Sequence, residues 1–136
     1  QEFSQRYQAV DESDRGMRFV LRQARSQDHK NRQNSNDDLS HEIKQEWLDR
    51  QTEVIELVKQ HYNWAISNNI AKECARVILP EGNTTSRLYL KGSIRSWIHY
   101  TQLRMANGTQ LEHMLIAREC ANAISKIFPM IHNIKD

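Results

Sequence analysis

The sequence predicts a mainly helical α+β chain, and three observations lead to this fold class. Apolar residues recur at helical spacing over a long stretch, 40–67. Two shorter helical patterns, 93–105 and 110–127, lie between turn and breaker residues. One short segment, 86–91, has the alternation typical of a strand. A length of 136 residues suits one domain.

The long helix is predicted at about 40–67. Its apolar positions share one period, and they are Ile43, Trp47, Val54, Val58, Tyr62 and Ala65. Asp37, Asp38 or Ser40 can cap the first turn, where Glu42 is also favourable. The run "SNN" at 67–69 should end the helix.

The segments around this helix give weaker signals. Residues 17–22 fit either a strand or one helical turn, whereas 22–38 contain almost nothing apolar and should be a loop or disordered in isolation. A second helix is expected at 70–79, ending before Pro80. The run "SRLYLK" at 86–91 is the best strand candidate, although it could also join the next helix.

Turn residues delimit the last two helices. Gly92 and Ser93 open the helix at about 93–105, and "NGT" at 107–109 breaks it. Thr109 and Glu112 have the spacing of a capping box, so the final helix is expected at about 110–127.

The overall composition bounds the function. Hydrophobic residues make up 38% of the chain, below the roughly 45–50% of typical globular domains, so the chain either leaves a part unpacked or buries surface against another protein. A net charge of +2 is too small to argue for nucleic acid.

Cys74 and Cys120 have no metal-site spacing and fit reduced thiols of a cytosolic protein. The sequence has no long apolar run and no signal peptide, and because it opens on Gln1 it reads as though it begins inside a larger protein.

Three polar clusters are candidate binding sites: Glu2, Ser4 and Arg6; Arg76 within "ARVILP"; and Ser93, Arg95, His99 and Arg104. Arginine presents a planar fork of donors, and a helix start exposes free N–H groups. Together they indicate a ligand that is anionic, planar or both. The alternative interpretation is structural: exposed arginines at the two helix ends, a half-buried histidine, and an Arg76 side chain that lies along the core.

Several segments, in order and spacing, resemble one family. They are "QEFSQRY", "RQARSQDHKNRQNS", "ECARVILP", "TTSRLYLKGSIRSWIHYTQLR" and "NGTQLEH". Together they resemble the C-terminal part of flavin-dependent thymidylate synthases over almost the whole chain. The Arg-His-Arg that begins the family's signature motif would fall before Gln1. The resemblance therefore implies one partial domain, residues 1–136, with a polar loop at about 22–38.

The resemblance implies roles at the matching positions. The positions that contact deoxyuridylate fall on Glu2, Phe3, Ser4, Gln5, Arg6 and Arg76, and Glu2 is also near the flavin. The flavin-contacting positions fall on Ser93, Arg95 and His99, although many members have asparagine at the first. Arg104 falls on the catalytic arginine that polarises the uracil ring. Arg95 and His99 share one face of their helix and Arg104 lies on another, so this helix would separate cofactor from substrate.

The implied reaction is the reductive methylation of dUMP to dTMP. The family uses FAD, with NADPH and methylenetetrahydrofolate as co-substrates and no metal, and it forms cytoplasmic homotetramers whose sites lie between subunits. Because the Arg-His-Arg is missing, we expect this chain to be inactive alone. The competing interpretations are a helical nucleic-acid-binding module and a structural module without catalysis.

Overall fold

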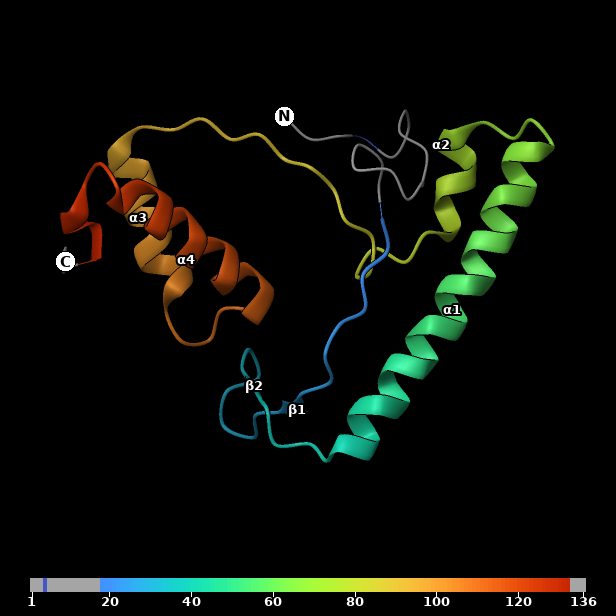
Figure 1. Ribbon diagram of the computed structural model, residues 1–136, viewed down its shortest axis with the longest axis horizontal. Coiled ribbons are helices and arrows are strands. Elements are labelled where there is room, and N and C mark those ends of the chain that lie inside the picture. The colour runs from blue at the N-terminus through green and yellow to red at the C-terminus, as the bar shows by residue number, and fades with distance from the viewer. Residues whose placement is uncertain (1–3, 5–17, 133–136) are drawn as a thin grey trace. The chain divides into compact units, whose positions relative to one another are not determined.

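The computed structural model describes residues 4 and 18–132 and divides into two compact units (Figure 1). The first unit comprises residues 1–24 and 39–90, and the second comprises 25–38 and 91–136. The first contains the helices α1 (His41–Ser67) and α2 (Lys72–Ala75) and the 3-10 turn η1 (Arg76–Ile78). The second contains β1 (Ser26–Gln27), β2 (Ser35–Asn36), α3 (Ile94–Met105), α4 (Leu111–Ser125) and the 3-10 turn η2 (Pro129–His132). The predicted mainly helical α+β class is confirmed.

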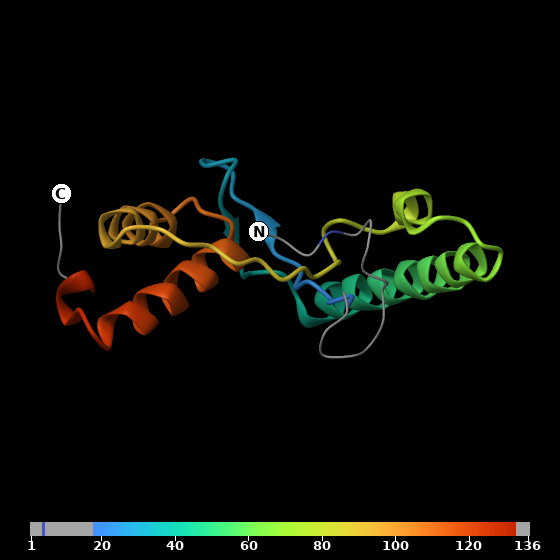
Figure 2. The same ribbon diagram turned by 90° about the horizontal axis from the view of Figure 1, so that it is seen from above.

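The α1 helix is long and uninterrupted, as Figure 2 shows. Ser40 is its N-cap and accepts a hydrogen bond from the Ile43 N–H at 3.4 Å. Hydrogen bonds from its own backbone and from Ser40 lower the pKa of Glu42, so its carboxylate stays ionised in the first turn. At the other end Asn69 takes a φ of 58°, a left-handed conformation that asparagine tolerates. Both predicted ends of this helix are therefore confirmed.

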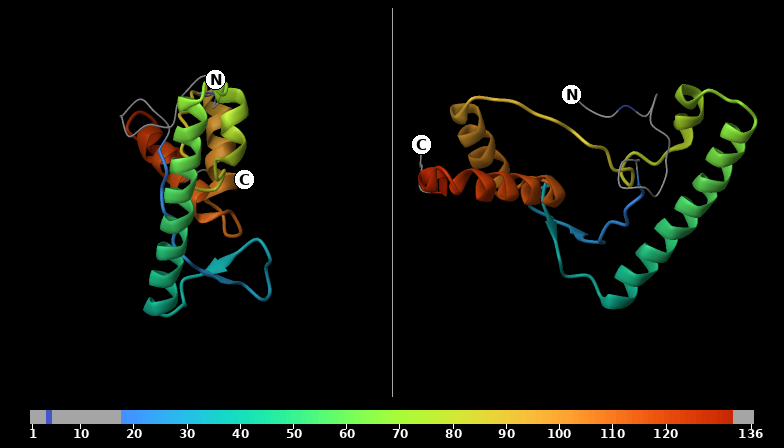
Figure 3. Two further views of the ribbon diagram at one scale, coloured as in Figure 1. Left: turned by 90° about the vertical axis from the view of Figure 1, so that its right-hand side faces the viewer. Right: turned by 45° about the horizontal axis from the view of Figure 1, so that its top comes forward.

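The core of the first unit lies where the end of α1 meets α2 and η1. Tyr62, Ala65, Ala75 and Leu79 are buried together, and Phe19, Val58 and Ile66 pack around them. Figure 3 shows α2 lying beside the C-terminal part of α1.

The second helix is shorter than predicted. The range 70–79 forms α2 only from Lys72 and then narrows to the 3-10 turn η1. Asn69 has a left-handed φ of 58° and the Ile70 N–H donates to the Ala65 carbonyl, so residues 69 and 70 still close the end of α1 and cannot begin the next helix. Leu79 is extended, with φ −72° and ψ 130°, because Pro80 disfavours helix in the residue before it.

The predicted strand at 86–91 is wrong. Within this range Leu88 alone forms a β-bridge. One bridge does not make a strand, which needs a run of paired residues. The range does not join α3 either, which begins at Ile94. The described part of the uncertain segment 17–22 is extended, since Phe19 forms an antiparallel bridge with Thr84.

The polar loop 22–38 contains local structure that its composition does not indicate. β1 and β2 pair antiparallel, with Ser26 opposite Asn36 and Gln27 opposite Ser35. The Gln27 amide also donates to the carbonyls of Asp28, Arg32 and Asn34, each at 3.2 Å. The hairpin is thus held by polar contacts rather than by a core.

α3 and α4 pack across one another (Figure 3). Ser93 caps α3 and accepts from the Ser96 N–H at 3.1 Å. Small side chains are buried on these helices: Thr101 is 2% exposed, Ala117 0% and Ala121 1%. Among the described helices none is long and apolar enough to cross a membrane.

The predicted capping box of Thr109 and Glu112 does not form. Gln110, not Thr109, is the N-cap of α4, and its side chain makes no capping bond. The Glu112 carboxylate accepts from Arg25 and Gln110 instead, so it is not available to cap the backbone.

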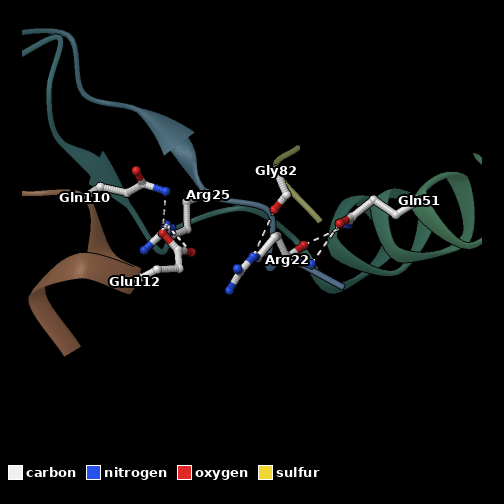
Figure 4. A network of polar contacts seen from close by, with 6 residues as sticks. All are labelled: Arg22, Arg25, Gln51, Gly82, Gln110 and Glu112. Atoms are coloured by element: carbon white, nitrogen blue, oxygen red, sulfur yellow. Dashed lines mark hydrogen bonds and ion pairs between the residues drawn. The ribbon is translucent and has the colours of Figure 1, made fainter. Parts of the chain in front are cut away.

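A buried amide organises the first unit. The Gln51 side chain, on a residue only 6% exposed, accepts from the Arg22 N–H at 2.8 Å and from the Asn83 side chain at 2.9 Å. It donates to the Arg22 carbonyl at 2.8 Å, as the close view in Figure 4 shows. One side chain thus joins α1 to the segment around Arg22 and to the turn containing Asn83.

Replacing Gln51 by Leu should destabilise this unit strongly. The change keeps the volume but leaves backbone groups of Arg22 without partners, at a cost of about 2–4 kcal/mol in the free energy of unfolding. Gln45→Leu is the matched control, because Gln45 is exposed on the same helix and its change should cost less than about 0.5 kcal/mol. Urea unfolding measures both. Equal costs for the two variants would contradict the role of Gln51.

Candidate functional site

The candidate ligand-binding side chains of the second unit lie along α3. Ser93 is its N-cap, and Arg95, His99 and Arg104 are all exposed on the helix that follows. At 3.6 residues per turn, His99 and Arg104 are separated by about 140° around the axis. The buried Thr101 faces inward. The helix therefore presents Arg95 with His99 on one exposed face and Arg104 on another.

The three side chains are available to a ligand. Within the described part of the chain, neither guanidinium nor the His99 ring makes a hydrogen bond or an ion pair. Exposed, uncompensated arginines bind phosphate or a planar carbonyl edge through two parallel donors. The Ser93 hydroxyl differs, because it accepts from the Ser96 N–H and shares a 2.9 Å hydrogen bond with the Ser96 hydroxyl.

Aromatic residues fix α3 next to these cations. The Trp97 and Tyr100 rings meet edge to face, with centroids 5.7 Å apart. The Tyr100 hydroxyl and Nε2 of His113, on α4, are 3.1 Å apart. This pair joins the two helices one turn before Arg104, so the stem of the arginine starts from a packed surface.

Burial of Tyr100 also controls its protonation. Desolvation, and secondly the nearby Cys120, raise its pKa, while Arg104 acts in the opposite direction. Desolvation likewise raises the pKa of the Cys120 thiol. Tyr100 is therefore a neutral hydrogen-bonding group at physiological pH.

The remaining predicted site residues belong to the first unit or lie outside the described residues. Arg76 begins η1 with an exposed side chain that makes no hydrogen bond or ion pair to a described residue. Ser4 is half-buried. Glu2, Phe3, Gln5 and Arg6 lie outside the described residues.

Sequence reasoning missed two polar pairs beside α3. One joins Tyr100 to His113, and the other joins Arg25 to Glu112 across a sequence separation of 87 residues. The helical spacing of Tyr100 indicated packing, but no local pattern identifies a partner so far along the chain. No group of residues suited to hold a metal ion occurs in the described part.

The chain is mainly helical, and α3 carries two exposed arginines and an exposed histidine, side chains suited to an anionic or planar ligand. The profile of the family described as "Thymidylate synthase complementing protein" matches residues 1–130. The chain belongs to this family.

Two curated relatives are similar over nearly the whole chain. A probable flavin-dependent thymidylate synthase of Paramecium bursaria Chlorella virus 1 is 45% identical over 136 residues, covering 100% of this chain and 60% of the relative. The flavin-dependent thymidylate synthase of Synechocystis sp. is 46% identical over 131 residues, covering 96% of this chain and 58% of the relative. The chain thus spans about 60% of the length of the curated relatives it matches.

A solved structure shares the fold. It is a UMP/dUMP methylase, PolB, from Streptomyces cacaoi bound with 5-Br dUMP, with a TM-score of 0.78 and 24% identity. The match covers 98% of this chain and 59% of that one.

We predict that Tyr100 ionises above the ordinary tyrosine value of about 10. Since folding raises its pKa, the stabilisation is fully present below the unfolded value and is lost as pH rises through the folded value. The tyrosinate absorbance of the original chain and of Tyr100→Phe should be followed as pH rises. The original chain should show one additional ionisation step, at a pH above the ordinary tyrosine pKa. If the tyrosine that the variant lacks ionises at or below the ordinary pKa, this assignment is refuted.

Proposed function

We propose that this chain is part of a flavin-dependent thymidylate synthase that reductively methylates dUMP to dTMP in the cytoplasm. The co-substrates are NADPH and methylenetetrahydrofolate, and the cofactor is FAD. The observation that carries the proposal is the family match over residues 1–130 combined with the exposed Arg95, His99 and Arg104 on α3. The bound 5-Br dUMP of the structural neighbour supports a pyrimidine nucleotide as substrate.

The side chains of the first α3 face fit a flavin. Arg95 and His99 are exposed donors, and the N-terminal turn of this helix favours negative charge. We assign Arg95, His99 and Ser93 to FAD binding, together with Glu2. When bound, the flavin supplies hydride chemistry; these side chains bind and orient it.

The second face is assigned to the nucleotide. Arg104 would donate to the uracil edge and stabilise negative charge on its carbonyl oxygen and N3, which raises electron density at C5. One preorganised donor of this kind contributes about 3–4 kcal/mol to catalysis. Phe3, Ser4, Gln5, Arg6, Glu2 and Arg76 are assigned to dUMP binding on their match to the family's positions.

A nucleic-acid-binding module is less well supported. On α1 the basic residues alternate with acids: Arg50 pairs with Glu46 at 2.7 Å and Lys59 with Glu56 at 2.9 Å. These pairs interrupt any continuous basic face, which phosphate tracking requires.

The complete enzyme is proposed to be a homotetramer. On α1, apolar side chains are exposed along one stripe next to the buried one: Ile43 53%, Trp47 46%, Val54 52%, Leu57 54% and Trp64 62%. A surface of this kind is typical of a protein contact.

Sedimentation at micromolar concentration should therefore find the chain associated. Val54→Lys and Leu57→Lys together should shift it towards the monomer, because lysine is disfavoured inside an interface. Gln45→Lys with Thr52→Lys, which add the same two charges at exposed positions of the same helix outside the stripe, serve as the charge control. A compact monomer of the original chain would count against assembly through this stripe.

The two faces of α3 can be separated by mutation in a chimera that places the N-terminal part of the Synechocystis relative before this chain. Arg104→Ala should retain FAD but weaken dUMP binding and slow methylation about 100-fold or more. Arg95→Ala should lose FAD first. Flavin absorbance after gel filtration and nucleotide titration measure the two effects.

The chain without that N-terminal part should form no dTMP from dUMP, NADPH, FAD and methylenetetrahydrofolate. Turnover by the chain alone would overturn the expectation that the added part completes the site. If Arg104→Ala loses flavin while Arg95→Ala keeps it, the assignment of the two faces is wrong.

A further inference from the structure

The hairpin at 25–38 is internally well tied in spite of its polar composition. Oδ1 of Asp28 accepts from the N–H groups of Lys30 and Asn31 at 2.8 and 3.1 Å. Oδ2 accepts from the Asn34 side chain at 2.9 Å. These bonds, with the backbone ones first, lower the pKa of Asp28 and keep it an acceptor. The β1–β2 ladder closes the base, so the hairpin can act as one piece.

One end of this hairpin is fixed to the start of α4. Nη2 of Arg25 lies 3.1 Å from Oε1 and 3.4 Å from Oε2 of Glu112 (Figure 4). The two side chains are only 14% and 24% exposed, so solvent screens the pair less than it screens a surface pair. Gln110 donates to the same carboxylate at 2.9 Å. Glu112 therefore holds both the hairpin and the residue that precedes α4.

The hairpin tip meets the same connection at a second point. Gly108 has a φ of 92°, and a Cβ built there would lie 3.2 Å from Nδ2 of Asn31. The α3–α4 turn, residues 106–110, thus approaches the tip closely at Gly108. Its last residue, Gln110, is linked to the hairpin base indirectly, through the Glu112 carboxylate that also accepts from Arg25. Both contacts lie within the second unit.

This turn begins immediately after the last turn of α3. Arg104 is the penultimate residue of that helix, and Ala106 is its C-cap. The turn is held at its middle, where Asn31 lies against Gly108, and at its α4 end, where Glu112 holds Gln110. Only two residues, 106 and 107, separate this held part from α3, so it limits where α3 ends and where the Arg104 side chain projects.

We propose that Arg25 is a positioning residue for nucleotide binding: by pairing with Glu112 it holds the hairpin against the 106–110 turn and so sets the orientation of Arg104. The step from the turn to the nucleotide rests on the function proposed above. We call the Arg25–Glu112 pair, with the hairpin and turn that it joins, the brace. The brace depends only on contacts within the second unit.

Three variants of the chain test the brace: Arg25→Ala, Arg25→Lys and, as control, Arg50→Ala. Arg50 also forms an arginine–glutamate pair, but its side chain is 67% exposed and it lies on α1. Amide hydrogen exchange should accelerate about tenfold at residues 106–112 in Arg25→Ala, the scale for losing a hydrogen bond to a charged group. Arg25→Lys should restore part of the protection, and Arg50→Ala should leave this segment unchanged.

Ligand titrations of the same substitutions, introduced into the chimera described above, test the positioning role. 5-Bromo-dUMP should bind about tenfold more weakly to Arg25→Ala, with partial rescue in Arg25→Lys, while FAD affinity stays unchanged. Equal weakening of both ligands would indicate general loosening and overturn the proposal. Unchanged exchange at 106–112 in Arg25→Ala would overturn the brace. Failure of the chimera without these substitutions to bind 5-bromo-dUMP would contradict the proposed function instead, and the exchange data would still decide the role of the Arg25–Glu112 pair.

Discussion

The close contact between α3 and α4 is the constraint on which the candidate site depends. Thr101 on α3 and Ala117 and Ala121 on α4 are almost fully buried, and small side chains of this kind allow helices to approach closely. With Thr101 turned inward, the helical period places Arg95 and His99 on the outer side of α3. Arg104 lies only about 60° from Thr101 around the axis and is exposed in the last turn of the helix. The packing of Thr101 against α4 therefore sets which faces of α3 carry the candidate binding residues.

Polar contacts hold distant segments together where the sequence lacks apolar residues. Gln51 joins distant backbone segments in the first unit, and the Arg25–Glu112 pair does so in the second. Both are partly or fully shielded from water. An unpaired polar group is costly in such a shielded place, so these contacts are strongly constrained. The low hydrophobic share of 38% is thus offset in part by buried polar contacts, while the exposed apolar stripe of α1 leaves surface for other chains.

The sequence predicted the features that depend on neighbours in the chain. Ser40 and Ser93 cap helices because their side chains reach the next turn, and Asn69 ends one because it tolerates a left-handed backbone. The strand at 86–91 and the Thr109–Glu112 box were wrong because distant partners decide them. A strand needs a ladder, and Glu112 is occupied by an arginine 87 residues away. The site residues remain predictions from the resemblance, of which the structure describes Ser4, Arg76 and the set at α3.

The central claim is that α3 separates the flavin from the nucleotide, and ligand titrations followed by nuclear magnetic resonance test it most directly. Side-chain and backbone signals of this chain, within the chimera that completes the proposed site, would be recorded while FAD and dUMP are added separately. The account predicts that FAD shifts the signals of Arg95 and His99, whereas dUMP shifts those of Arg104. If both ligands shift the same face, or if neither shifts any signal of α3, the account is contradicted.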